Sequence, residues 1–194
     1  MNGIPVRLFV ALQIPDDVRN ALNRFVEPLR SLAPRAKWVR AENLHVTLNF
    51  LGNTDPLKVN SIKNALSEIQ SGQPVTLNFR GLGFFPNERR PRVFWVGIEA
   101  STNLAAVAAR IDRAIHAVGF PSEDRPFAPH LTLARFDAPT IPPRLVAAID
   151  ENAFRNFGST VAHDFHLIES KLRSTGAEYT SLQSFQFVTE RPSK

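Results

Sequence analysis

Two short segments with the same residue pattern constrain the fold of this chain more than any other feature. Residues 44–48 read Leu-His-Val-Thr-Leu and residues 129–133 read Pro-His-Leu-Thr-Leu, so each contains a His-x-Thr-x motif in which x is apolar. Because residues two apart on a β-strand point to the same side, each motif predicts a strand with His and Thr on one face and apolar residues facing the core. The motifs lie nearly half the chain apart, which indicates two structurally related halves with one copy each. Outside the motifs, the halves resemble each other too weakly to establish a duplication.

Around the motifs, hydrophobic periodicity predicts strands and helices without the regular β-α alternation of a parallel, doubly wound sheet. Asp16 and Asp17 are predicted to cap a helix, and Pro28 predicts that this helix kinks or breaks. Asp55 followed by Pro56 predicts the start of a second helix. The predicted strands cover residues 7–14, 38–39, 44–51, 75–79, 93–99, 127–136, 161–172 and 179–188, and the predicted helices cover residues 18–29, 56–69, 104–118 and 144–150.

Composition restricts both the class of protein and its chemistry. The 194 residues are 43% hydrophobic and 21% charged, which is typical of a globular protein, and we expect one two-lobed domain over residues 1–194. No apolar stretch approaches the length of a membrane span, and the short run Val6–Ile14 contains Arg7, so we interpret it as a strand and not as a signal peptide. Cysteine is absent, which excludes disulfides and thiolate chemistry within this chain and is compatible with the cytoplasmic location that we expect. The formal net charge of +5 favours an anionic partner, either a nucleic acid or a small anion.

The two motifs supply the groups needed for chemistry at phosphorus. Histidine is the side chain most easily poised to be neutral in one copy and protonated in another near pH 7. A neutral imidazole can take a proton from water, and an imidazolium can give one to a leaving oxygen. Thr47 and Thr132 can donate hydrogen bonds to the non-bridging phosphoryl oxygens. The pair of motifs therefore predicts that His45 and His130 are catalytic in a phosphoesterase without a metal ion or cofactor, and leaves open which of them is the acid.

Longer segments around the motifs resemble a known family. They are residues 37–52 (Lys-Trp-Val-Arg-Ala-Glu-Asn-Leu-His-Val-Thr-Leu-Asn-Phe-Leu-Gly), 81–86 (Gly-Leu-Gly-Phe-Phe-Pro), 91–97 (Pro-Arg-Val-Phe-Trp-Val-Gly) and 125–135 (Arg-Pro-Phe-Ala-Pro-His-Leu-Thr-Leu-Ala-Arg). With them, nearly the whole chain resembles the 2H phosphoesterases, in particular the bacterial and archaeal RNA 2′,3′-cyclic phosphodiesterases, also called 2′-5′ RNA ligases. The resemblance implies a bilobal α+β fold of two antiparallel β-sheets with outer helices, related by a pseudo-two-fold axis, with the active-site cleft between the sheets.

The same resemblance implies an activity and a role for each motif residue. The expected reaction is hydrolysis of RNA 2′,3′-cyclic phosphate ends to 2′-phosphates, with tRNA fragments among the candidate substrates. His45 would protonate the leaving 3′ oxygen, His130 would activate water, and Thr47 and Thr132 would hold the phosphate. The reverse reaction, which joins a 2′,3′-cyclic phosphate to a 5′-hydroxyl, would exchange these roles.

Arg135 matches an arginine that contacts phosphate in members of the family. Strict alternation along a strand would place Arg135 on the face opposite His130 and Thr132. A role for Arg135 in substrate binding therefore requires the strand to bulge or to end before this residue. The alternative is that Arg135 is a surface arginine.

The remaining histidines and glycines have simpler interpretations. His116 is predicted on the polar border of a helix, exposed to solvent. His163 and His166 lie three residues apart on a predicted strand and thus on opposite faces, which argues against a shared metal ion. Gly81-x-Gly83 lacks the third glycine and the lysine of a phosphate-binding loop, so we expect a tight turn there.

The arginines that flank the Gly81-x-Gly83 segment and two phenylalanines near the motifs each leave two interpretations open. The four arginines at positions 80, 89, 90 and 92 are interpreted either as contacts to the RNA backbone or as part of a solvated charged loop. Phe50 and Phe127 could stack on a terminal base, with packing in the core as the default for both.

Two other functions remain as alternatives. A sibling enzyme would keep both motifs and act on 2′,5′-linked oligonucleotides or on another cyclic phosphate. A non-catalytic RNA-binding module would use the positive charge and not the histidines. In all three cases we expect a monomer, because a cleft built within one chain requires no partner.

Overall fold

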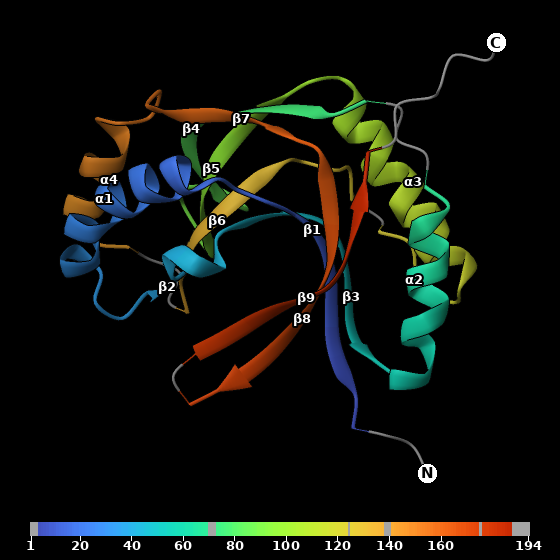
Figure 1. The fold of residues 1–194 in the computed structure, drawn as a ribbon. Coiled ribbons are helices and arrows are strands. Elements are labelled where there is room, and N and C mark those ends of the chain that lie inside the picture. Colours follow the sequence, from blue (N-terminus) through green and yellow to red (C-terminus); the bar gives the residue numbers. More distant parts are fainter. Residues whose placement is uncertain (1–3, 70–72, 124, 138–140, 175, 188–194) are drawn as a thin grey trace.

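Two antiparallel sheets carry one motif strand each in the computed structural model, which describes residues 4–69, 73–123, 125–137, 141–174 and 176–187 (Figure 1). Sheet A has the strand order β3-β1-β8-β9, and sheet B has the order β2-β6-β5-β4-β7. The strands are β1 (Val6–Gln13), β2 (Lys37–Trp38), β3 (His45–Thr54), β4 (Val75–Phe85), β5 (Val93–Ala100), β6 (His130–Arg135), β7 (Asn156–Ala162), β8 (Asp164–Arg173) and β9 (Gly176–Gln186). Apart from β2 at its edge, sheet B repeats the arrangement of sheet A: the order β6-β5-β4-β7 corresponds to β3-β1-β8-β9, with a motif strand first and antiparallel pairing throughout.

The helices are exchanged between the two sheets. They are α1 (Asp16–Leu32), α2 (Val59–Ser67), α3 (Asn103–Ala117) and α4 (Pro143–Asp150), with short 3₁₀ helices η1 (Ala41–Asn43) and η2 (Pro56–Lys58). Helix α1 follows β1 of sheet A but packs with α4 against sheet B, whereas α3 follows β5 of sheet B but packs with α2 against sheet A (Figure 1). This arrangement confirms the predicted α+β fold of two antiparallel sheets with outer helices. Among the described residues, no helix is long and apolar enough to span a membrane.

One hydrophobic core receives residues from both sheets. The apolar residues of the first motif, Val46 and Leu48, and those of the second, Leu131 and Leu133, are all buried in it. The intervening His and Thr residues stay partly exposed on the opposite faces of their strands. The predicted orientation of both motifs is therefore confirmed. The expectation of a single domain over residues 1–194 stays a prediction.

Helix α1 differs from its prediction at both ends. Its N-cap is Pro15 and not Asp16 or Asp17. Both acidic residues lie in the first turn, where their negative charges interact favourably with the helix dipole. The helix also continues through Pro28 to Leu32, so it does not break there, and the kink given as the other expectation stays a prediction. Burial of Leu29, one turn beyond Phe25 on the same side, extends the apolar stripe past the proline and offsets the lost backbone hydrogen bond.

The glycines at positions 81 and 83 lie within a strand, so the predicted tight turn is wrong. Strand β4 continues to Phe85, and its register with β5 shifts between Phe79 and Leu82, where Gly81 has a φ of +79°. A Cβ atom at Gly83 would lie 2.4 Å from Cζ2 of Trp95, so the indole occupies the space of a missing side chain. The glycines thus serve a bulge and a close packing contact.

Other strand boundaries differ by a few residues. The second motif strand begins at His130, where residue 127 was expected. The predicted strand 161–172 covers the end of β7 and most of β8, which are separate strands on either side of His163. Position 188 of the last predicted strand lies outside the described residues. Asp55 caps η2 as predicted, through a 3.0 Å hydrogen bond from the backbone N–H of Leu57 to its carboxylate.

The contact between Gly83 and Trp95 makes a testable prediction. The substitution Gly83→Ala should lower the free energy of unfolding by about 1–3 kcal/mol, because the added methyl group overpacks against the indole. Urea denaturation measures this change. Combining it with Trp95→Phe should cost less than the sum of the two single substitutions, and full additivity would show that the indole does not fill this space.

Candidate active site

A bulge in β6 brings Arg135 to the side of its strand that carries His130 and Thr132. Thr132 pairs with Trp95 of β5, but the next pair is Ala134 with Phe94, which leaves Leu133 as the extra residue. Leu133 and Ala134 are consequently both buried, and Arg135 is exposed. The bulge that a role for Arg135 in substrate binding requires is therefore present. Its contact with phosphate stays a prediction.

The first motif strand contains a bulge at the equivalent position. Thr47 pairs with Ala11 of β1 and Asn49 pairs with Val10, so Leu48 is the extra residue. The residue five positions after His45 is Phe50, which thus corresponds to Arg135 of the other half. Phe50 is 54% exposed, so the default expectation that it packs in the core is wrong, whereas Phe127 is partly buried against the core.

His45 is held by a hydrogen bond and by two aromatic rings. Its Nδ1 lies 2.7 Å from the carbonyl oxygen of Asn43 at the end of η1. The imidazole lies 4.7 Å from the ring of Phe9, and it makes an edge-on contact at 5.3 Å with the ring of Tyr179. Tyr179 and Phe9 also contact each other at 5.1 Å. Residues of β1 and β9 therefore restrict the plane of this imidazole.

His130 has a closely similar environment. Its Nδ1 lies 2.8 Å from the carbonyl oxygen of Ala128, which like Asn43 stands two residues before its histidine. Phe85 meets the imidazole edge-on at 4.9 Å and in turn packs against Trp95 at 5.2 Å. The two histidines are thus oriented by the same kind of hydrogen bond, and each has an aromatic ring packed edge-on against its imidazole.

These hydrogen bonds determine which nitrogen of each imidazole is available for chemistry. A backbone carbonyl can only accept a hydrogen bond, so Nδ1 carries the proton in both neutral histidines. Nε2 is then a free base in the neutral form and a donor in the protonated form. An imidazole arranged in this way can serve as a general base or a general acid at Nε2.

Burial and positive charge favour the neutral form of both histidines. Burial lowers the pKa of His45, and the charges of Arg135 and His130 lower it further, against the hydrogen bond to Asn43, which raises it. The pKa of His130 is lowered by burial and by Arg135, against the hydrogen bond to Ala128. His130 and Arg135 come from sheet B, whereas His45 comes from sheet A, so these influences cross between the sheets. Strands β3 and β6 do approach each other there.

Tyr179 is a site residue that the sequence did not single out. Burial raises the pKa of its hydroxyl, while the charges of Arg135 and Arg7 lower it, so the hydroxyl lies within electrostatic range of an arginine from each sheet. Arg7 also stacks over the ring of Phe50 at 5.0 Å. No motif marks Tyr179, because it is near His45 only through the pairing of β9 with β8 and of β8 with β1.

Two of the other histidines have hydrogen-bond partners outside the motifs. His116 bonds the carbonyl oxygen of Phe120 through Nδ1 at 2.9 Å. His166 lies between the hydroxyl of Ser181 at 2.9 Å and the carboxylate of Asp164 at 3.2 Å. In the described part of the chain, no three His, Cys, Asp or Glu side chains are grouped as metal ligands.

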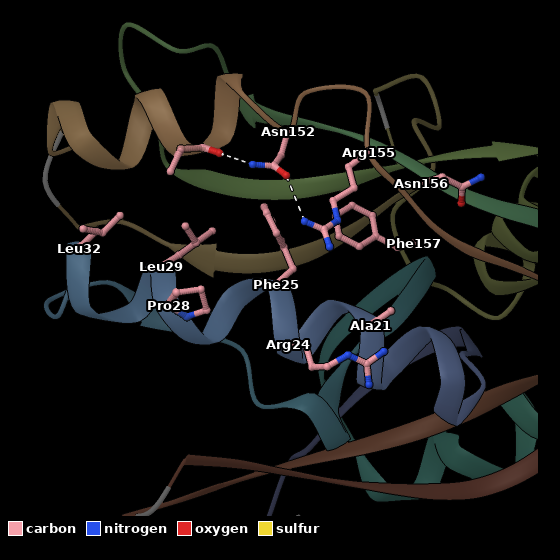
Figure 2. Close-up of a pocket in the computed structure, with 11 residues that line it drawn as sticks. Ala21, Arg24, Phe25, Pro28, Leu29, Leu32, Asn152, Arg155, Asn156 and Phe157 are labelled. Atoms are coloured by element: carbon pink, nitrogen blue, oxygen red, sulfur yellow. Dashed lines mark hydrogen bonds between the residues drawn. The ribbon is translucent and has the colours of Figure 1, made fainter.

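A pocket between α1, the end of α4 and β7 is separate from the candidate site (Figure 2). Apolar residues of α1 form one wall, and Asn152 and Arg155 lie opposite them. None of the motif residues, and not Arg135, lines this pocket. The lining residues are Ala21, Arg24, Phe25, Pro28, Leu29, Leu32, Ala148, Asn152, Arg155, Asn156 and Phe157.

Comparison with known families connects this site to a class of enzymes. The family model described as LigT like Phosphoesterase matches the chain twice, over residues 12–95 and over residues 96–179. The chain belongs to this family. Each match contains one His-x-Thr-x strand, which supports the relation between the two halves that the motifs alone did not establish.

Curated relatives and solved structures extend over nearly the whole LigT-like chain. It is 32% identical over 182 residues to the RNA 2′,3′-cyclic phosphodiesterase of Methanothermobacter thermautotrophicus, with 93% of this chain and 98% of that protein covered. The protein of the same name from Archaeoglobus fulgidus is 33% identical over 181 residues, with 93% and 100% covered. The crystal structure of a Thermus thermophilus protein, TT0787, superposes with a TM-score of 0.74 at 31% identity, covering 95% of this chain and 100% of that one. Escherichia coli LigT complexed with 3′-AMP gives 0.74 at 28% identity, covering 94% and 98%.

The influence of Arg135 on both histidines can be tested directly. The substitution Arg135→Gln removes a positive charge that disfavours the imidazolium, so the pKa values of His45 and His130 should both rise. Titration of the imidazole carbon-bound protons by NMR measures this change. Unchanged titration of both histidines would show that the guanidinium lies too far from them to act in the site.

Proposed function

We propose that this protein hydrolyses 2′,3′-cyclic phosphate ends of RNA to 2′-phosphomonoesters by two-histidine acid–base catalysis. The observation that carries the proposal is the pair of imidazoles whose Nδ1 atoms are each held by a carbonyl, which leaves Nε2 available for proton transfer on two motif strands that approach each other. The curated relatives named RNA 2′,3′-cyclic phosphodiesterase support the choice of substrate. E. coli LigT, whose structure has been solved with 3′-AMP and with phosphate, supports a nucleotide-sized ligand.

In the proposed reaction, His130 Nε2 takes a proton from water as the water oxygen attacks phosphorus. The bond from phosphorus to the 3′ oxygen breaks, and His45 Nε2 gives its proton to that oxygen. The product carries a 2′-phosphate and a free 3′-hydroxyl. Thr47, Thr132 and Arg135 stabilise the negative charge on the non-bridging oxygens. Joining to a 5′-hydroxyl would put that hydroxyl in place of water as the nucleophile, with the 3′ oxygen again the leaving group, so His130 and His45 would keep these roles and would not exchange them as expected from the sequence.

The acid in this scheme acquires its proton with the substrate. Burial and Arg135 favour neutral imidazoles in the free protein. The negative phosphodiester offsets the charge of Arg135 and favours an imidazolium beside it. Substrate binding is therefore coupled to protonation of one of the two imidazoles. The resemblance to the family assigns that proton to His45 and the role of base to His130.

The wall formed by sheet A is suited to the nucleoside. Phe50 is exposed beside Arg7, whereas the equivalent position on sheet B carries the cationic Arg135. Bases of single-stranded RNA stack on such rings for about 1–3 kcal/mol each. We assign the phosphate to the side of Arg135 and the terminal base to Phe50.

Substitution of the histidines tests this mechanism. His45→Ala and His130→Ala should each lower turnover of a 2′,3′-cyclic-phosphate oligonucleotide by about 10²–10⁴-fold, because each removes one proton transfer. Circular dichroism controls for folding. Full activity in either variant would contradict two-histidine catalysis, and complete loss of wild-type activity on EDTA treatment would indicate a metal enzyme.

The product and the pH profile separate the proposal from its alternatives. We expect a 2′-phosphomonoester and a bell-shaped pH dependence of kcat/KM whose acid-side midpoint lies below 6.5, because the pKa of the base is lowered and the base stays neutral to lower pH. Cleavage of 2′,5′-linked oligonucleotides in preference to the cyclic end would favour the sibling activity. Binding of RNA without turnover would favour a non-catalytic module.

A further inference from the structure

Each motif histidine is held by a hydrogen bond from its Nδ1 to the carbonyl two residues earlier. The two carbonyls that accept these bonds are fixed in different ways. Ala128 precedes Pro129, and a proline restricts the residue before it to extended conformations. The orientation of the Ala128 carbonyl is therefore set locally. Asn43 precedes Leu44, which imposes no such restriction. Its carbonyl shares a peptide group with the Leu44 N–H, which donates a 3.2 Å hydrogen bond to the Ala41 carbonyl, so the direction of the Asn43 carbonyl depends on how η1 itself is held.

The side chain of Asn43 provides that support. Its Nδ2 donates a 2.7 Å hydrogen bond to the carbonyl oxygen of Ala177 in β9, 134 residues along the chain. Asn43 is only 8% exposed, and among the described residues it and Thr54 are the buried polar side chains. Because an unpaired buried amide costs about 1–3 kcal/mol, this hydrogen bond firmly connects η1 to β9.

Strand β9 contacts the surroundings of His45 a second time. Tyr179 lies two residues after Ala177 and packs edge-on against the imidazole, with ring planes at 82°. Ala177 of β9 thus holds the side chain of Asn43, whose carbonyl binds Nδ1 of His45. Tyr179 of β9 restricts the plane of the same imidazole. At His130 the residue equivalent to Asn43 is Ala128, which has no side-chain hydrogen bond to offer.

We propose that Asn43 is the positioning residue of His45. Its side-chain amide fastens η1 to β9, and its carbonyl thereby keeps the imidazole proton on Nδ1 and Nε2 directed at the reacting oxygen. The consequence for turnover rests on the proposed function. The consequence for the tautomer of His45 does not depend on any substrate.

The substitution Asn43→Ala tests this role in two ways. Loss of a group that orients a metal-binding histidine typically costs about 10–100-fold. We expect a fall in kcat of the same order here, because the imidazole is oriented in the same way, with little change in KM. In ¹H–¹⁵N spectra of the imidazoles near neutral pH, His45 should change from the Nδ1–H tautomer to a mixture of both tautomers. His130 should keep its Nδ1–H tautomer, because Pro129 is unaffected.

A matched control is available on the other side of sheet B. Asn152 also donates from Nδ2 to a backbone carbonyl, that of Ala148, at 2.8 Å (Figure 2). Asn152→Ala removes the same kind of bond away from the motifs and should change neither kcat nor the His45 tautomer. Asn43→Asp keeps the size of the side chain but places an acceptor against the Ala177 carbonyl, so it should not restore activity.

The outcomes separate this proposal from the proposed function. Wild-type tautomer and kcat in Asn43→Ala would overturn the role of Asn43 while leaving the activity intact. A changed tautomer in a protein that does not hydrolyse cyclic phosphates would support the role and overturn the proposed function. If Asn43→Ala does not fold, Asn43→Asp, which keeps the size of the side chain but cannot donate to the Ala177 carbonyl, replaces it, and an unchanged His45 tautomer in that variant would equally overturn the proposal.

Discussion

The bulge that follows each motif threonine is the constraint on which the candidate site depends. Without the extra residues Leu48 and Leu133, strict alternation would direct the fifth residue after each histidine into the core. With them, two leucines stay buried while Phe50 and Arg135 return to the side of the histidines. A guanidinium could not be buried there without a large desolvation cost, so the bulge lets one short strand satisfy both the core and the site.

Opposing effects set the protonation of the two histidines. The carbonyls of Asn43 and Ala128 stabilise the imidazolium, but burial outweighs them, and the charge of Arg135 adds to burial. The free site is therefore biased toward two neutral bases beside a cation. In the proposed reaction, an anionic substrate removes this bias, so the protonated acid forms where its leaving group is bound and not in the empty site.

The sequence was informative wherever the determinant is local. Alternation within each His-x-Thr-x segment placed His45 and His130 opposite the core. The match of Arg135 to a phosphate-contacting arginine of the family required the strand to bulge or to end before this residue. The sequence could not identify Tyr179 or Asn43, because their importance arises from contacts between residues more than 100 positions apart in the chain. It misjudged Gly83 for the same reason, because the indole that requires a missing side chain belongs to another strand. Of the kink or break expected at Pro28, the break does not occur, because burial of Leu29 outweighs local propensity.

Under the proposed function, the two halves keep in common what the reaction requires on both sides of phosphorus and differ where the substrate is asymmetric. In-line displacement at phosphorus needs a proton-transfer group on each side, and both halves retain a histidine with its Nδ1 bound to a carbonyl. A nucleotide has its base on one side of the phosphate only. The corresponding positions have diverged to Phe50 in one half and Arg135 in the other. The supports have diverged as well, to a long-range amide at Asn43 and a local proline after Ala128, so the orientation of His45 depends on the C-terminal strands in a way that the orientation of His130 does not.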